Sequence, residues 1–394
     1  MGEVAIVGVG LHPWGKFDDK TITDMSVEAT MRALKDANIE WEDVQEVVAG
    51  EWIWGSTTGL NPGASITTVM GQTGIPTTNV FNMCATATNV LRAAYNVVAS
   101  GQRDIVLAVS GDKSPKGFFT TMGHTDDPTD SDFLRWKMMG LTNPGYWAME
   151  CRRRMEKYGT TERHLAKAKV ACSKYGALNP DALYRKVFTE EEVLNSPMVC
   201  DPLRLFMICA TRDGAAAAIL CSADKAKKFN AKPITIAGVG EGSSLFGDPT
   251  PVLGLLCATV PGTAPLVSES YTSSQMAYKM AGIGPEDIDF VEVPDNSSWH
   301  FLQYPETLGF WKPGETDRML DEEATGLGSK LPINTSGGIA SFGEAVAATG
   351  LAQIYELVLQ LRGQAGARQV DGARIGLAQT YGQLGNSASA ILKI

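Results

Sequence analysis

The sequence has few histidines and cysteines, and it lacks any cysteine pair at metal-ligand spacing. Only 4 His and 7 Cys occur among the 394 residues, and no C-x-x-C motif is present. An odd number of cysteines without such pairs argues against both a disulfide framework and a zinc site. We therefore expect no metal site in this chain.

Long basic and long apolar stretches are also missing. The formal net charge is -10, without an extended run of Lys or Arg, which excludes the electrostatic footprint of a nucleic-acid or anionic-membrane partner. No apolar stretch approaches the roughly 18 residues of a membrane span. The first residues, MGEVAIVGVG, do not resemble a secretion signal. We expect a cytoplasmic protein that binds neither nucleic acid nor membranes.

Apolar strand patterns that alternate with helical patterns are abundant. Short apolar runs at residues 5–10, 44–50 and 104–111 read as buried strands, and helical spacing follows over residues 25–38 and 85–100. This alternation predicts an α/β fold with a largely parallel buried sheet. The length exceeds what one simple core usually spans, so we expect two fused halves.

An internal repeat supports the two halves. Residues 33–51 match residues 277–295 without a gap, and chance similarity of two helix-turn-strand segments is the alternative. The identical positions include Ala33, Lys35, Ala37, Ile39, Glu42 and Asp43, which recur as Ala277, Lys279, Ala281, Ile283, Glu286 and Asp287. We predict an N-terminal half over residues 1–265 and a C-terminal half over 266–394. The alternation of strand and helix patterns is interrupted over residues 112–232. We interpret this range as an insertion, which is either a lid or an excursion from the sheet without such a role.

Cys84 is the first candidate for chemistry. A short extended segment leads into this cysteine, and an amphipathic helix follows it. The positive end of a helix stabilises a thiolate, which is the form of cysteine that acts as a nucleophile. The alternative is a buried small apolar residue, which is the interpretation we favour for the other six cysteines.

Two further segments carry candidate residues. In NTSGGIASFGEAVAATG, paired glycines precede Glu344, which is either a helix cap or a carboxyl group in a dry pocket with a raised pKa. In AQTYGQLGNSAS, Tyr381 ends a predicted strand and is either a half-buried anchor or a hydrogen-bond donor. The N–H group of the adjacent Gly382 is accessible to a ligand oxygen.

These elements together resemble the thiolase superfamily, and within it the sterol-carrier-protein-type thiolases. By this resemblance, Cys84 takes the place of the acyl-accepting cysteine, and Glu344 replaces the His of the usual GHP element because this chain reads GEA. Tyr381 replaces the Cys of the C-x-G element, and Gly382 keeps the oxyanion-binding glycine. The element that usually begins Asn-Glu-Ala-Phe starts here with Pro294-Asp295-Asn296, so three of four catalytic elements depart from the common pattern.

The resemblance implies a five-layered αβαβα fold with duplicated halves and an inserted covering-loop domain, a coenzyme A thioester substrate and a tight homodimer. It places Ser243 and Ser244 near the pantetheine arm of coenzyme A. His300 is an alternative base, or a packing residue beside Trp299. An apolar acyl pocket, or alternatively an interface or core, would be formed by Trp52, Trp54, Phe118, Phe119, Met138, Met139, Tyr146 and Trp147.

Three functions stay open. The first is a thiolase that cleaves or forms a bulky, aromatic 3-oxoacyl-CoA such as benzoylsuccinyl-CoA through an acyl-enzyme on Cys84. The second is a retro-aldolase acting on a steroid-type β-hydroxyacyl-CoA, which would leave Cys84 idle, and the third is a non-catalytic CoA-binding scaffold. Relatives of the first two kinds work with a small OB-fold subunit that carries a zinc ribbon, so any zinc would lie on that partner.

Overall fold

The computed structural model describes residues 2–51, 60–114, 142–230, 232–248, 264–382 and 385–394. Six of the eight residues predicted for the acyl pocket lie outside these ranges. They are Trp52, Trp54, Phe118, Phe119, Met138 and Met139. No helix in the described ranges has the length and apolarity that crossing a membrane requires.

The first part of the chain forms strands and helices in the predicted alternation. They are β1 (Val4–Gly15), α1 (Ile22–Ala37), β2 (Glu46–Glu51), α2 (Pro62–Met70), β3 (Thr77–Val80), α3 (Thr86–Ala99), β4 (Ile105–Lys113) and, after an excursion, β7 (Asp213–Ser222) and the short α8 (Ala223–Ala226). The predicted strands and helices of this part are all found, with ends that differ by a few residues.

The second part repeats this order of elements. It contains β8 (Ile234–Ser243), α9 (Ser268–Ala281), β9 (Phe290–Glu292), α10 (Ser298–Thr307), α11 (Thr316–Asp321), α12 (Gly338–Phe342), α13 (Thr349–Arg362), β10 (Ile375–Gly382) and β11 (Asn386–Lys393).

The strands pair in one nine-stranded sheet with the order β3-β2-β4-β7-β1-β8-β11-β10-β9. The run β1-β7-β4-β2 recurs as β8-β11-β10-β9 with the same relative directions. The two segments of the sequence repeat occupy equivalent places, because short 3-10 turns at Trp41–Asp43 and Pro285–Asp287 precede β2 and β9. The duplication is thus visible in the topology.

The sheet is less parallel than the sequence suggested. Among the described strands of this sheet, parallel pairing occurs only between β2 and β3, β2 and β4, and β9 and β10, at the two ends of the sheet. The inner pairs are antiparallel. The reason is that β7 runs back beside β4, and β11 runs back beside β10. Apolar runs that are buried on both faces do not reveal the direction of a strand.

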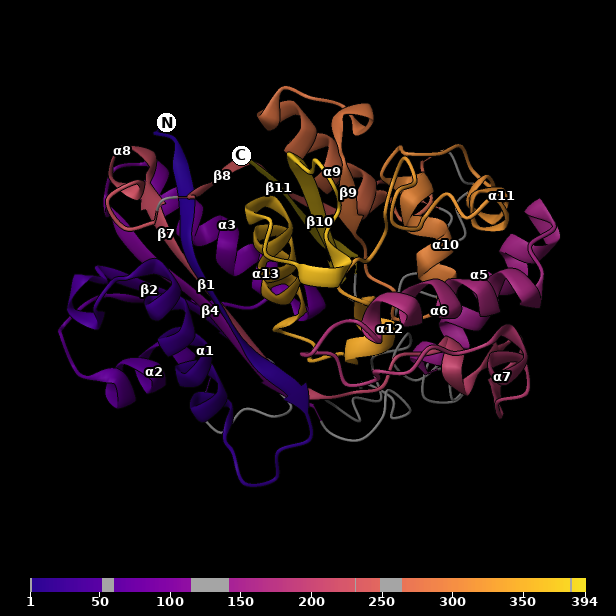
Figure 1. Cartoon of the computed structure of the whole chain (residues 1–394), viewed down its shortest axis with the longest axis horizontal. Coiled ribbons are helices and arrows are strands. Elements are labelled where there is room, and N and C mark those ends of the chain that lie inside the picture. The colour runs from indigo at the N-terminus through magenta and orange to yellow at the C-terminus, as the bar shows by residue number, and fades with distance from the viewer. Residues whose placement is uncertain (1, 52–59, 115–141, 231, 249–263, 383–384) are drawn as a thin grey trace.

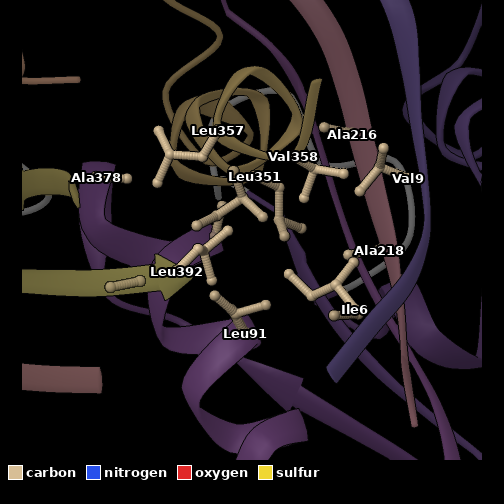
Figure 2. Packing of buried hydrophobic residues seen from close by; sticks show 14 of the residues in the cluster. Ile6, Val9, Leu91, Ala216, Ala218, Leu351, Leu357, Val358, Ala378 and Leu392 are labelled. Atoms are coloured by element: carbon tan, nitrogen blue, oxygen red, sulfur yellow. The ribbon is translucent and has the colours of Figure 1, made fainter. Parts of the chain in front are cut away.

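Helices cover the sheet in the layers of a five-layered αβαβα arrangement. Helices α3 and α13 contact strands of both halves and form the central layer, whereas α1 packs only on strands of the first half and α9 only on strands of the second (Figure 1). The central core is apolar, and Figure 2 shows Leu351 and Val358 of α13 packed toward Leu91 of α3, with Ile6 of β1 and Leu392 of β11 closing the sides.

The excursion between β4 and β7 packs on the second half of the molecule. It contains α5 (Asn143–Tyr158), α6 (Glu162–Gly176), α7 (Glu190–Leu194) and the small pair β5 (Met198–Cys200) and β6 (Leu203–Arg204). Helices α5 and α6 contact α10, and α6 also contacts α11 and α12 (Figure 1). The buried guanidinium of Arg154 in α5 donates to the carboxylates of Glu306 and Asp317, which fixes this contact.

The predicted insertion boundaries need a correction. The expected range of 112–232 includes β7, which is an inner strand paired with both β4 and β1. The run of alanines in β7 has weak strand character, so sequence patterns did not identify it. Among the described residues, the part between β4 and β7 therefore comprises Ser114 and residues 142–212.

Candidate active site

Cys84 lies where a strand changes into a helix, as predicted. It is half-buried in a 3-10 turn, Met83–Ala85, between β3 and α3. Met83 takes φ 50°, in the left-handed region, which costs a non-glycine residue roughly 1–2 kcal/mol. The Thr86 hydroxyl accepts the N–H of Asn82 and donates to the carbonyl of Met83, which pins the turn. The thiol thus lies at the N-terminal end of α3, where the helix field favours a thiolate.

Glu344 is not a helix cap. It lies between α12 and α13, and α13 begins only at Thr349. Its backbone pairs instead with the segment before β7, because its N–H donates to Ala210 and its carbonyl accepts from Arg212, at 2.7 and 2.8 Å. The side chain has an exposed fraction of 0%. This pairing holds a carboxyl group inside the protein.

The Glu344 carboxyl group meets three hydrogen-bond partners in its buried position. The thiol of Cys209 donates to Oε2 at 3.6 Å. Burial raises the pKa of Glu344 to about 7, and hydrogen bonds from the Cys84 thiol, the Asn296 side chain and the Cys209 thiol partly oppose that rise. A carboxyl group with this pKa exchanges protons readily near neutral pH.

Asp295 connects the segment around Asn296 to the Gly-rich turn. Its carboxylate accepts the N–H groups of Ile339 and Ala340 at 2.6 and 3.2 Å, and so caps the short helix α12. Gly338 allows this approach, because a Cβ there would lie 2.3 Å from the Asp295 carboxylate. Asp295, which belongs to the segment that replaces the usual Asn-Glu-Ala-Phe element, therefore fixes the loop that carries Glu344.

Tyr381 and Gly382 end β10 beside the turn that carries Cys84. The Tyr381 hydroxyl accepts from the indole N–H of Trp147 at 3.3 Å. Burial raises the pKa of the Tyr381 hydroxyl well above its usual value, and the Cys84 and Glu344 side chains act in the same direction. Gly382 lies against Asn82, since an added Cβ would be 2.9 Å from the carbonyl oxygen of that residue.

His300 is buried in an aromatic cluster next to this site. Its Nδ1 accepts the N–H of Ser297 at 3.0 Å, so it closes a capping box at the start of α10. Its ring lies 5.1 Å from that of Trp147 and 5.3 Å from that of Tyr381. Burial lowers the pKa of His300 to about 3, which keeps the ring neutral and makes it a poor proton acceptor at neutral pH.

The remaining predicted residues lie on α5 and at the end of β8. Of the acyl-pocket candidates, Tyr146 and Trp147 are buried on α5, where Tyr146 packs edge-on against Trp299. The Ser244 hydroxyl donates to the buried Glu269 at 3.2 Å. Ser243 lies at the exposed end of β8 and pairs with Asn386 of β11.

Sequence analysis did not identify two buried side chains of the site. Cys209 lies in an irregular segment next to β7, and no local pattern marked it. Asp112 ends β4 and accepts the N–H of Ala347 at 3.3 Å. Burial raises the pKa of Asp112 to about 7, and the Glu344 charge contributes. Each residue reaches the site only through tertiary packing, and none of the described cysteines forms a disulfide.

Two family models cover most of the chain. A model of the N-terminal domain of thiolase matches residues 4–224. A model described as thiolase C-terminal domain-like matches residues 262–393.

Curated relatives match over nearly the whole length. The acetyl-CoA acetyltransferase of Methanothermobacter thermautotrophicus is 35% identical over 99% of this chain and 98% of its own. Sterol carrier protein 2 of Bos taurus is 33% identical over 96% of this chain and 70% of its own.

Solved structures share the fold. The Ltp2-ChsH2(DUF35) aldolase superposes with a TM-score of 0.83 at 25% identity, over 100% of this chain and 98% of that chain. Human mitochondrial 3-ketoacyl-CoA thiolase superposes with a TM-score of 0.72 at 18% identity, over 100% of this chain and 98% of that chain, which supports the fold alone.

Proposed function

The chain belongs to the thiolase family and is a thiolase-type acyltransferase, and from this premise we propose that it cleaves or forms a bulky 3-oxoacyl-CoA through an acyl-enzyme on Cys84. The observation that carries the proposal is the position of Cys84 in the turn that leads into α3, together with the fully buried carboxyl group of Glu344, whose raised pKa the Cys84 thiol partly lowers. A nucleophile with an acid/base nearby is what a two-step acyl transfer requires.

The first half of the reaction uses both side chains. Cys84 passes its proton to Glu344, and the thiolate attacks the 3-keto carbon. The bond between C2 and C3 then breaks, its electron pair moves to C2, and Glu344 returns the proton to C2. One acyl-CoA leaves, and the other acyl group stays on Cys84 as a thioester.

The second half reverses the proton transfer. The thiol of free CoA gives its proton to the Glu344 carboxylate, and its sulfur attacks the acyl-cysteine. The tetrahedral intermediate collapses and expels the Cys84 thiolate. A pKa of about 7 suits Glu344 to give and accept this proton.

We assign backbone N–H groups as the hydrogen-bond donors to the oxyanion that develops during the reaction. The N–H groups of Cys84 and Gly382 are the candidates, because the Cys84 turn packs against the end of β10. The Tyr381 hydroxyl, which already accepts from Trp147, has its own proton available for the thioester oxygen. Ser243 and Ser244 remain the proposed contacts of the pantetheine arm.

A bulky aromatic substrate, with benzoylsuccinyl-CoA as the specific hypothesis, fits better than a bare acetyl group. The histidine and cysteine that most thiolases use are replaced by Glu344 and Tyr381. In addition, aromatic side chains surround the site, with Trp147, His300 and Tyr304 packed around Tyr381. Such rings offer stacking partners for an aromatic acyl group.

Mass spectrometry of the intact protein tests the proposal. Incubation with benzoylsuccinyl-CoA is expected to add a benzoyl group to the wild type and none to Cys84→Ala, and thiolysis by the variant is expected to fall by about 1,000-fold or more. Cys209→Ala is the matched control, since its thiol also contacts Glu344 but is buried. Activity of Cys84→Ala within tenfold of the wild type would reject the acyl-enzyme.

A retro-aldolase is the second candidate, favoured by the likeness to the Ltp2-ChsH2(DUF35) aldolase. In that reaction a β-hydroxyacyl-CoA is split by proton transfers at Glu344 and Tyr381, without a covalent intermediate. Cleavage of such a substrate by Cys84→Ala at the wild-type rate would establish this function. The third hypothesis, a non-catalytic scaffold, has no comparable support.

We also propose a small partner subunit with an OB fold and a zinc ribbon, which would carry any zinc. The Ltp2-ChsH2(DUF35) aldolase, which shares the fold, is named with a second component, and this motivates the proposal. The described part of the insertion gives no separate support, because residues 142–212 form α5 to α7 in packed positions. Co-purification from the native host and a gain of activity on adding the partner would support it; full activity of the isolated chain would exclude it.

A further inference from the structure

A pocket is lined by Cys209, the residue whose thiol donates to Glu344. It has a volume of about 370 Å³ and is bounded by α6, the chain before α7, and the irregular segment that leads into β7. Its walls are largely apolar, with rings of Tyr184, Phe188 and Phe206. The sequence analysis assigned none of these residues to a site.

A buried cation lies at this pocket. Lys169 of α6 has an exposed fraction of only 5%, and its ammonium group donates to the carbonyl of Ala340. The nitrogen lies 5.3 Å from the centre of the Tyr184 ring and 5.0 Å from that of Phe188. Among the described residues, no carboxylate forms an ion pair with it, and burial lowers its pKa. The Asp295 carboxylate acts on this charge only from beyond ion-pair distance, and with the Cys172 and Cys209 thiols it partly opposes the lowering of the pKa. An anionic ligand in direct contact would therefore stabilise the buried ammonium group further.

The other charges at the pocket are also positive. Arg212 donates to the Tyr184 hydroxyl at 3.1 Å. Lys16, at the rim, pairs with Asp213 at 3.0 Å. An anionic group entering the pocket would therefore meet two cations, Lys169 and Arg212, without a carboxylate partner of their own in the described part of the chain.

The pocket is close to the reacting atoms. Cys209 lines it, and the same thiol donates to Oε2 of Glu344. One side chain therefore separates the pocket from the proposed acid/base. This proximity favours the acyl part of a substrate, because the phosphates of coenzyme A lie a full pantetheine arm away from the thioester.

We propose that this pocket binds a free carboxylate on the acyl group of the substrate, with Lys169 as the anchor and the Tyr184 and Phe188 rings as the apolar wall. The inference rests on the proposed thiolase function and deepens it, because it selects acyl groups that carry a carboxylate beside an apolar body. Benzoylsuccinyl-CoA has this feature, and benzoylacetyl-CoA, which lacks the carboxymethyl branch, does not.

The kinetic test compares these two thioesters. Lys169→Met keeps the length of the side chain and removes its charge. We expect kcat/KM for benzoylsuccinyl-CoA to fall about 10- to 100-fold, as for loss of a hydrogen bond to a charged group, with less than a threefold change for benzoylacetyl-CoA. Lys169→Arg should keep the preference. Lys167→Met is the matched control, because Lys167 lies on the same helix, pairs with Asp321 and is outside the pocket.

A binding test needs no turnover. Calorimetry is done with 4-oxo-4-phenylbutanoate and its amide, and we expect the wild type to bind the carboxylate at least tenfold more tightly. Lys169→Met should remove the difference, and Lys167→Met should keep it. Equal affinity of the wild type for the acid and the amide, or an equal kinetic loss for both thioesters in Lys169→Met, would overturn the inference.

The two tests separate this inference from the proposed function. Binding of the keto acid through Lys169 without any acyl-enzyme on Cys84 would support the pocket and reject the thiolase reaction. Conversely, acyl-enzyme formation from both thioesters, with no preference that depends on Lys169, would support the reaction and reject the pocket.

Discussion

Cys84 and Cys209 contact the same carboxyl group from different environments. Burial raises the pKa of the Cys209 thiol well above its usual value, and the Glu344 charge adds to the effect, so this thiol stays protonated and donates to Glu344. Cys84 is half-buried at the start of α3. The same residue type therefore serves as a hydrogen-bond donor at one position and as the proposed nucleophile at the other.

Replacement of Glu344 by Gln tests the acid/base role. The amide keeps the shape of the side chain and removes the proton, so we expect turnover to fall roughly 100- to 10,000-fold with little change in CoA affinity. Glu344→His should not restore activity, because the neighbouring elements also differ from the usual pattern. A loss of affinity with turnover preserved would instead indicate a structural carboxylate.

The pH dependence of the first half-reaction provides a second measurement on Glu344. In the first half-reaction Glu344 accepts the proton of Cys84 before it returns this proton to C2, so the reaction starts from the carboxylate, and burial raises the pKa of this group to about 7. The single-turnover rate of acyl-enzyme formation should therefore increase as the pH rises through about 7, and this pH dependence should be absent in Glu344→Gln. A rate that falls over this range in the wild type would contradict the assignment.

At the scale of elements, the short helix α12 depends on a residue from another segment. A helix of this length has little stability of its own. The Asp295 carboxylate supplies acceptors for its first N–H groups and also accepts from the thiol of Cys172 on α6. Through α12, Asp295 positions the loop that ends at Glu344.

Asp295→Ala should destabilise the protein by about 1–2 kcal/mol, as for loss of a helix cap, and should lower kcat more than it raises KM because Glu344 loses its fixed position. Asp295→Asn keeps an acceptor oxygen and should retain more of both properties. Denaturant unfolding and steady-state kinetics measure the two effects. Wild-type kinetics in Asp295→Ala would show that α12 does not position the site.

At the scale of the whole molecule, several carboxyl groups are buried and retain their protons near neutral pH. Burial raises the pKa values of Asp112, Glu150, Glu269 and Glu344 to about 7 each. In the unfolded chain these groups release their protons near their ordinary pKa values, so the unfolded state binds fewer protons between about pH 4.5 and 7.

The free energy of unfolding should therefore decrease as the pH rises. We expect it to be lower at pH 8.5 than at pH 6 by ~2 kcal/mol or more. Urea unfolding at the two pH values measures this difference, and Glu344→Gln should show a smaller one because it removes one of the four groups. Higher stability at pH 8.5 would contradict the burial of protonated carboxyl groups.

The end of the sheet at β3 is our proposed site for homodimer formation. This strand pairs only with β2 among the described strands, and Phe81, just after it, is 42% exposed beside the Cys84 turn. An edge strand with an exposed ring is suited to pairing with a second copy. Phe81→Lys should shift the chain toward the monomer in sedimentation velocity, whereas Met31→Lys on the exposed face of α1 should not.

The homodimer would be excluded if the wild type sedimented as a monomer at micromolar concentration.

The predicted cytoplasmic location and the division into folding units at residue 265 stay predictions.

The sequence by itself determined the α/β fold, the repeat, and the positions of Cys84, Glu344 and Tyr381. Apolar periodicity and the matched segments at residues 33–51 and 277–295 are local signals, so they can be recognised without coordinates. The strand direction of β7 and the contacts of Cys209, Asp295 and Lys169 needed the tertiary structure, because each depends on residues distant along the chain. Burial raises the pKa of Glu344 and keeps the ammonium group of Lys169 out of water. Burial is a property of packing, and no local pattern encodes it.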